Sequence, residues 1–159
     1  MGRGKRSRRC SDDGAAAVEF ALVVPLLVLV LFGIISYGVM LSFRQSLSQA
    51  AAEGARAAAV TFLEDDKKDE AVLAVTGALD SFDVSCTEGG DLIRDGEGDV
   101  GACDISEPKA CVPAAGEGVQ CVIVTLTYDY KNSSIVPTFP GVGIILPDTL
   151  TYEAQARVS

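Results

Sequence analysis

The sequence predicts an α+β protein in which a long N-terminal transmembrane helix extends into a small antiparallel β-sheet head. An uncharged apolar run, an alanine-rich stretch that follows it, and three segments of alternating apolar and polar residues support this fold class. The expected regions are a basic leader at 1–14, a transmembrane helix at 15–43, a helical stalk with a short helix at 44–80, and a disulfide-stapled β domain at 81–159.

The apolar run from Phe20 to Phe43 contains 24 residues without a charge. That exceeds the roughly 20 residues that a helix needs to cross a bilayer. Pro25 lies in the first turns, where a missing backbone donor should bend the helix. Five basic residues precede the run, so we expect a single-pass cell-membrane protein with a cytoplasmic N-terminus and an extracytoplasmic C-terminus.

The helix is expected to continue beyond the membrane, from about Ala15 to Phe62. Residues 42–61 are rich in alanine, the best helix former, and contain no proline. A polar break at 64–68 follows. The apolar positions of 69–79 then fit a short amphipathic helix better than a strand.

Three later segments alternate apolar and polar residues, namely 82–86, 122–129 and 150–158. This period of two is typical of half-buried strands. We therefore expect a small antiparallel sheet, with its apolar face covered by the stalk and the short helix. The long segment 87–118 is predicted to be a surface loop, and a second loop rich in proline and glycine precedes the last strand, at 137–147.

Five cysteines are present, one of them in the leader (Cys10). Four cysteines in a small extracytoplasmic region suggest two disulfides, with three connectivities open. A disulfide within the long loop, Cys103 to Cys111, is weakly favoured. Zinc ligation and unpaired thiols are the alternatives, although the spacing lacks a CxxC pair. The candidate disulfide residues are Cys86, Cys103, Cys111 and Cys121.

Charge divides sharply along the chain. Residues 1–14 hold five basic and two acidic residues, whereas residues 15–159 hold eight basic and twenty acidic residues. So acidic a region argues against binding to nucleic acid or docking on an anionic lipid surface. The chain has no histidine, the commonest general base and metal ligand. An enzyme is therefore the least expected class, and no metal or other cofactor is expected.

Glu19 is the only charge between Ala15 and Phe43. Placing an ionised carboxylate at membrane depth costs roughly 3 kcal/mol or more of free energy, so its presence indicates a functional role. Gly14 and the basic leader stand just before it. The whole stretch from residue 8 to 33, RRCSDDGAAAVEFALVVPLLVLVLFG, resembles the start of TadE-like proteins, the minor pilins or pseudopilins of tight-adherence (Flp-type) pilus systems. The likeness continues through AAAEGARAAAV at 50–60.

This resemblance implies a pilin-like, non-enzymatic assembly component. It implies that a membrane-embedded prepilin peptidase cuts after Gly14 and leaves Ala15 as the new N-terminus. Glu19, followed by Phe20, would then pair with the N-terminal ammonium of a neighbouring subunit. The implied partners are the prepilin peptidase, other pilin subunits and minor pilins, the membrane assembly platform and membrane lipid.

Other interpretations of the same segments remain open. The leader and helix also fit a plain signal anchor that carries a binding module unrelated to pili, or a secretory signal peptide that frees a soluble domain. The segment AAAEGARAA also fits a close-packing face for neighbouring helices. The acidic residues Asp95, Glu97 and Asp99 fit a solvated loop better than a calcium loop, because the glycine expected at the sixth position is missing.

Overall fold

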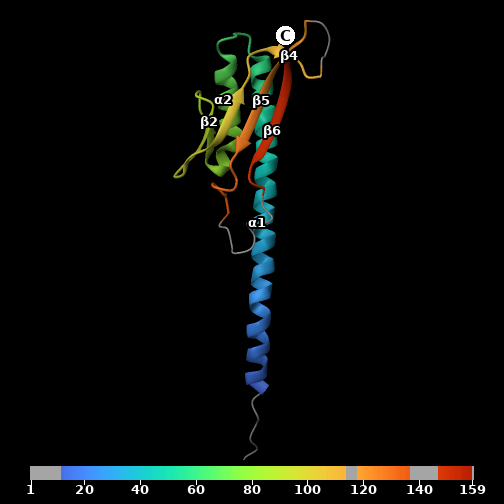
Figure 1. The fold of residues 1–159 in the computed structure, drawn as a ribbon, viewed down its shortest axis with the longest axis vertical. Coiled ribbons are helices and arrows are strands. Elements are labelled where there is room, and N and C mark those ends of the chain that lie inside the picture. Colours follow the sequence, from blue (N-terminus) through green and yellow to red (C-terminus); the bar gives the residue numbers. More distant parts are fainter. Residues whose placement is uncertain (1–11, 114–117, 137–146, 159) are drawn as a thin grey trace, which may run out of the picture. The chain divides into compact units, whose positions relative to one another are not determined.

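The computed structural model describes residues 12–113, 118–136 and 147–158. The predicted basic leader at 1–11 and residues 137–146 of the predicted proline- and glycine-rich loop lie outside these residues. The chain divides into two compact units, residues 1–36 and 37–159. One helix, α1 (Asp12–Val60), belongs to both units (Figure 1). The predicted α+β fold class is confirmed.

The first unit contains the apolar part of α1. Its large side chains are exposed, for example Leu22 at 75% and Leu26 at 69%. The helix is long and apolar enough to cross a membrane. Pro25 lies inside it, and the helix continues past this residue. Apolar side chains with no protein to cover them suit a helix whose solvent is lipid, so this segment is a candidate membrane anchor.

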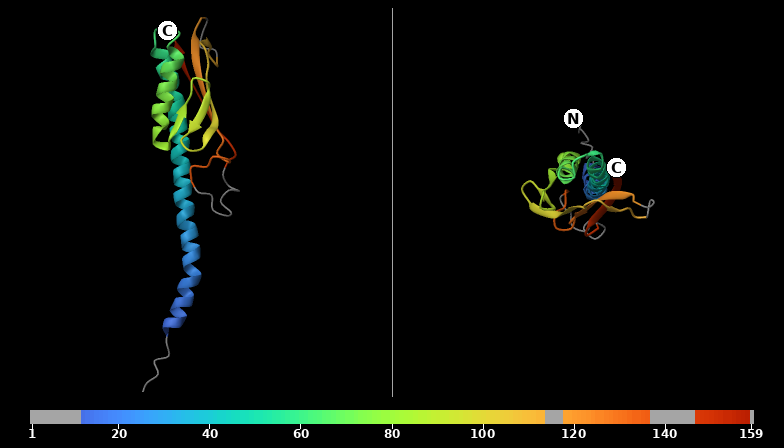
Figure 2. Two further views of the ribbon diagram at one scale, coloured as in Figure 1. Left: turned by 90° about the vertical axis from the view of Figure 1, so that its left-hand side faces the viewer. Right: turned by 90° about the horizontal axis from the view of Figure 1, so that it is seen from above.

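The second unit, called the head below, consists of residues 37–159. The C-terminal part of α1 and a second helix, α2 (Lys67–Leu79), cover one face of a six-stranded sheet (Figure 2). A short 3-10 turn, η1 (Asp80–Phe82), follows α2. The strands are β1 (Val84–Cys86), β2 (Asp91–Arg94), β3 (Gly98–Ile105), β4 (Lys109–Ala110), β5 (Gln120–Tyr128) and β6 (Leu150–Val158).

β5 is the centre of the sheet, in which all pairs are antiparallel. It pairs with β3 and β4 along one side and with β6 along its whole length on the other. β2 and then β1 extend the sheet beyond β3. Among the described strands, β1, β4 and β6 each pair on one side only, and β4 is just two residues long.

The prediction of three strands was too low. The segments 122–129 and 150–158 correspond to β5 and β6, and 82–86 contains β1 and the last residue of η1. The predicted loop 87–118 also contains β2, β3 and β4, so the expectation of an irregular loop was wrong for these residues. β3 shows no period of two because its register with β2 shifts along the strand, so its buried residues Val100 and Cys103 are three positions apart.

The core of the head is built around Phe43 of α1, which is fully buried. Its ring meets those of Tyr128 and Phe82 edge-on, with centroids 4.7 and 5.0 Å away. Such aromatic pairs contribute beyond their buried area. The sheet therefore packs on α1 through large aromatic residues near the end where the helix enters the head.

Candidate functional site

Gly14 and Ala15 are exposed in the first turns of α1. A Cβ atom added at Gly14 would meet no atom within 4 Å. The packing of the described residues therefore does not require a glycine at this position. A requirement for the smallest residue here has to come from something outside the described chain.

Glu19 is exposed one turn further along the same helix, next to the exposed Phe20. Its carboxylate forms no ion pair or hydrogen bond with any residue that the structure describes. The geometry brings Glu19, Phe20 and Pro25 onto one helix without supplying a counter-ion for the acid. A lone carboxylate in an apolar helix is costly, so a partner for Glu19 has to be sought outside the described residues.

The small residues of 50–60 are used inside the head. Gly54 has no room for a side chain, because an added Cβ would lie 2.7 Å from Cγ2 of Val75. Close approach of this kind is what small residues permit. The predicted packing face of AAAEGARAA thus contacts the chain's own α2 and sheet. The buried members are Ala50, Ala51, Gly54, Ala55 and Ala58.

Two disulfides join the four head cysteines. Cys86 pairs with Cys103, and Cys111 pairs with Cys121. The weakly favoured Cys103–Cys111 pairing was therefore wrong. Cys103 lies opposite Leu126 on β5, whereas Cys111 follows the strand that lies opposite Cys121. Cys103 and Cys111 are therefore more than five strand positions apart along β5, which is over about 17 Å and too far for a disulfide.

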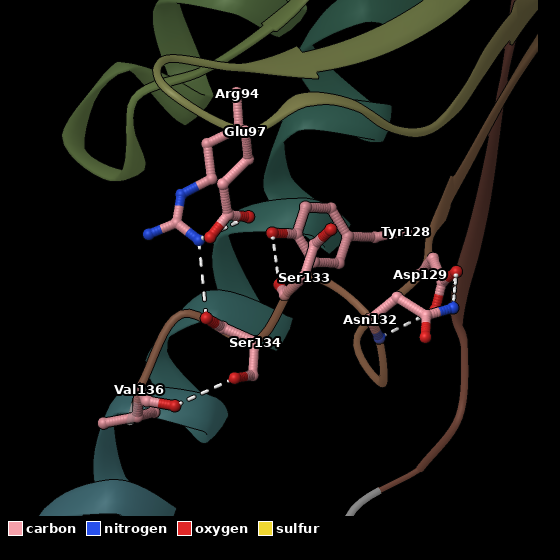
Figure 3. Close-up of polar contacts among 8 residues, drawn as sticks. All are labelled: Arg94, Glu97, Tyr128, Asp129, Asn132, Ser133, Ser134 and Val136. Carbon is pink, nitrogen blue, oxygen red and sulfur yellow. Dashed lines mark hydrogen bonds and ion pairs between the residues drawn. The ribbon is translucent and has the colours of Figure 1, made fainter. Parts of the chain in front are cut away.

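A polar cluster that the sequence did not indicate lies around Tyr128, the residue whose ring contacts Phe43 (Figure 3). Arg94 at the end of β2 has a side chain only 18% exposed and forms an ion pair of 3.2 Å with Glu97. The same guanidinium donates to the carbonyl of Ser134. Tyr128 donates its hydroxyl to the carbonyl of Ser133, at 2.7 Å. Together these bonds fasten the segment after β5 to the β2–β3 hairpin.

The titration of this region follows its burial. Burial raises the pKa of Tyr128 and of Tyr130 above the ordinary value of 10.0. The folded head thus favours the neutral form of both phenols. Their contribution to the stability of the head is fully present below pH 10 and is lost as the pH rises through the raised pKa values. In the turn that follows, hydrogen bonds from Asn132 lower the pKa of Asp129.

The acidic loop considered for calcium uses two of its carboxylates within the chain. Glu97 pairs with Arg94, and Asp99 accepts a hydrogen bond from the backbone N–H of Gly101. No group of three or more metal-ligating side chains occurs in the described part of the chain.

A cleft of about 250 Å³ lies at the other end of the head, where α1 ends. Its floor includes Ala58, Ile105 and Val122, and its rim carries charges of both signs. Lys67 lines it, with a side chain 8% exposed that pairs with Glu64 at 2.9 Å. Buried lysines are rare unless paired, and here a local carboxylate supplies the partner.

These features define a class of protein: one candidate membrane helix joined to a disulfide-linked α+β head. Residues 14–56 match the model of a family described as TadE-like protein. The resemblance predicted from the sequence is thus confirmed for this segment, which begins at Gly14 and contains Glu19. The comparison with curated proteins found no match, and neither did the comparison with solved structures.

Proposed function

We propose that the protein is a minor pilin or pseudopilin of a tight-adherence pilus, a non-enzymatic component of its assembly. The observation that carries this proposal is the TadE-like match over residues 14–56. The match begins at the proposed cleavage site and ends among the small residues that α1 buries inside the head. In this proposal the anchor spans residues 15–43, with the N-terminus in the cytoplasm and the head outside.

In this proposal a prepilin peptidase matures the protein by cleaving the bond between Gly14 and Ala15. Gly14 is exposed, and the packing of the described residues does not require a glycine there, which supports a role in fitting a narrow enzyme site. Cleavage would remove the basic leader but leave the apolar helix attached to the head. Ala15 would then carry a free ammonium group.

Glu19 gains a function from this cut. Its carboxylate has no counter-ion among the described residues, and the new ammonium of a neighbouring subunit would supply one. Pairing would offset the cost of holding both charges at the membrane edge and would set the axial register of the subunits. The proposed partners are therefore other pilin subunits and minor pilins, with the membrane assembly platform and lipid around the helices.

The test is the N-terminus of the protein extracted from membranes of cells with an active prepilin peptidase. N-terminal sequencing and intact mass are expected to give a chain that starts at Ala15. Gly14→Leu should block the cut. Gly33→Leu is the matched control, since Gly33 lies on the same helix and is equally open to an added Cβ atom.

A chain that keeps its basic leader in such cells would overturn the proposal and favour a signal-anchored binding module. A soluble form that starts near Glu53 would overturn it in favour of a secreted domain. Cleavage of Gly14→Leu at the normal rate would remove the proposed role of this glycine.

A further inference from the structure

β6 is a long open edge of the head's sheet. Its nine residues pair with β5 along their whole length, and no other described strand pairs with its outer side. The opposite end of the sheet is the three-residue β1. An open edge presents backbone N–H and C=O groups that can pair with another strand. β6 is therefore the part of the head best suited to accept one.

The side chains of β6 form two rows with different surroundings. The row that faces α1 is apolar and packs against the core. Leu150, at its start, is buried, but the four residues that follow it in this row are only partly buried. Extending the sheet past β6 would cover more of this row. The partly buried row is Tyr152, Ala154, Ala156 and Val158, and the exposed row is Thr151, Glu153, Gln155 and Arg157.

We propose that β6 pairs antiparallel with β6 of a second copy of this chain, about a two-fold axis at Gln155. Glu153 of each chain then lies opposite Arg157 of the other. Opposite charges in directly opposed cross-strand positions stabilise a pair of strands. On the other face the apolar residues meet, Tyr152 opposite Val158 and Ala154 opposite Ala156. Such a contact is closed and involves the same surface of both copies.

The charges select this register over its neighbours. An axis at Glu153 or at Arg157 would place two like charges directly opposite each other, which destabilises a strand pair. An axis at Ala154 or Ala156 would leave both charges without an opposite charge across the strands. Among these five centres on β6, only Gln155 pairs both charged residues.

The net charge of the head sets the conditions for pairing. Residues 37–159 hold 19 acidic and 8 basic side chains, a net charge of −11, so two heads repel each other at low salt. At about 0.15 M salt the screening length is about 8 Å. Remote repulsion is then screened, whereas neighbours across paired strands, about 5 Å apart, still interact.

The pairing also determines how two chains face each other. β6 begins beside Arg44, whose Nε donates to the hydroxyl of Tyr152 at 2.8 Å. It then runs alongside α1 toward the end of the head where α1 ends (Figure 1). Antiparallel strands therefore place the head portions of the two α1 helices in opposite directions. The pairing rests on the head alone and does not depend on the function proposed above.

The test uses the full chain in detergent at 0.15 M salt, with Cys10→Ser to remove the leader thiol. Gln155→Cys should give a covalent dimer with a short bis-maleimide, because the two thiols meet at the axis. Thr151→Cys is the control, since its two copies lie eight strand positions apart, about 27 Å. Gln155 also bonds the backbone of Val112, so the fold of each variant is checked by tyrosine fluorescence.

Charge exchange gives an independent readout by analytical ultracentrifugation, with residue 155 unchanged. Glu153→Arg and Arg157→Glu should each weaken dimerisation about tenfold, because two attractive pairs become repulsive. The double variant should restore it. No cross-link at 155, equal cross-linking at 151, or single variants that dimerise like the parent would each overturn the proposal. None of these outcomes depends on cleavage at Gly14.

Discussion

At the scale of single residues, Glu19 and Arg94 show two ways of accommodating a charge. Arg94 is largely buried, and Glu97 and the carbonyl of Ser134 accept its hydrogen bonds within the head. Glu19 is exposed on an apolar helix and has no partner in the described chain. A buried charge left without partners would be costly, so Arg94 is a structural residue. Glu19 is instead expected to act through a contact with another molecule.

Replacing Glu19 with Gln tests this difference. Insertion into the membrane should be unchanged or improved, because the cost of the carboxylate is removed. Incorporation into sheared surface pili should fall at least about tenfold, the effect of losing roughly 1.4 kcal/mol of pairing. Immunoblots of the pilus and membrane fractions measure both quantities.

Glu53→Gln is the matched control, since Glu53 lies on the same helix and forms only an exposed pair with Arg56. Such surface pairs contribute little. Normal incorporation of the Glu19 variant would refute its role in assembly, even if cleavage at Gly14 were confirmed.

At the scale of elements, two glycines allow neighbouring elements to pack closely. Gly54 lets α1 contact α2, and Gly101 lets β3 approach β5. A Cβ atom at Gly101 would lie 2.0 Å from the backbone oxygen of Thr127. Backbone atoms cannot move aside as the end of a flexible side chain can. The pairing of β3 with β5 is therefore incompatible with any larger residue at this position.

Gly101→Ala should lower the free energy of unfolding of the head by about 3 kcal/mol, the cost of an overpacked contact. Urea denaturation followed by tyrosine fluorescence measures it, since all four tyrosines lie in residues 37–159 and the chain has no tryptophan. Gly77→Ala on α2 is the control. Its position is exposed and open, so alanine should stabilise the helix by up to about 1 kcal/mol. A Gly101 variant as stable as the parent would contradict the close approach of the strands.

At the scale of the whole molecule, the two disulfides hold a strongly acidic head together. Cys86–Cys103 ties β1 to β3 beside the turn that precedes β2, and Cys111–Cys121 ties the end of β4 to the start of β5. They close loops of similar size, with sequence separations of 17 and 10. Restricting the unfolded chain in this way stabilises the fold, and disulfides of this kind persist in oxidising compartments outside the cytoplasm.

Replacing either cysteine pair with alanine should therefore lower the free energy of unfolding by about 3 kcal/mol. The urea midpoint of tyrosine fluorescence reports the change. Cys10→Ser, outside the head, should leave the midpoint unmoved. An unchanged midpoint after loss of either pair would show that the disulfides contribute nothing to the stability of the head.

Much of this architecture could be predicted because its signals are local. The uncharged run around Pro25 indicated the apolar helix, and alanine-rich residues indicated its continuation to about Phe62, close to its observed end at Val60. Alternation of side chains revealed β5 and β6. β3 escaped prediction because its register with β2 shifts, so its buried residues do not alternate, and because Gly101 is explained only by the close approach of β5.

The sequence by itself determined the apolar helix, the lone acid within it, the short second helix and the two clearest strands, since each depends on residues close together in the chain. Only the tertiary structure decided which cysteines pair, where the small residues of α1 pack, and that Arg94 meets the segment after Tyr128. These outcomes depend on strand register, which brings residues far apart in the chain within bonding distance and leaves no mark in the local pattern.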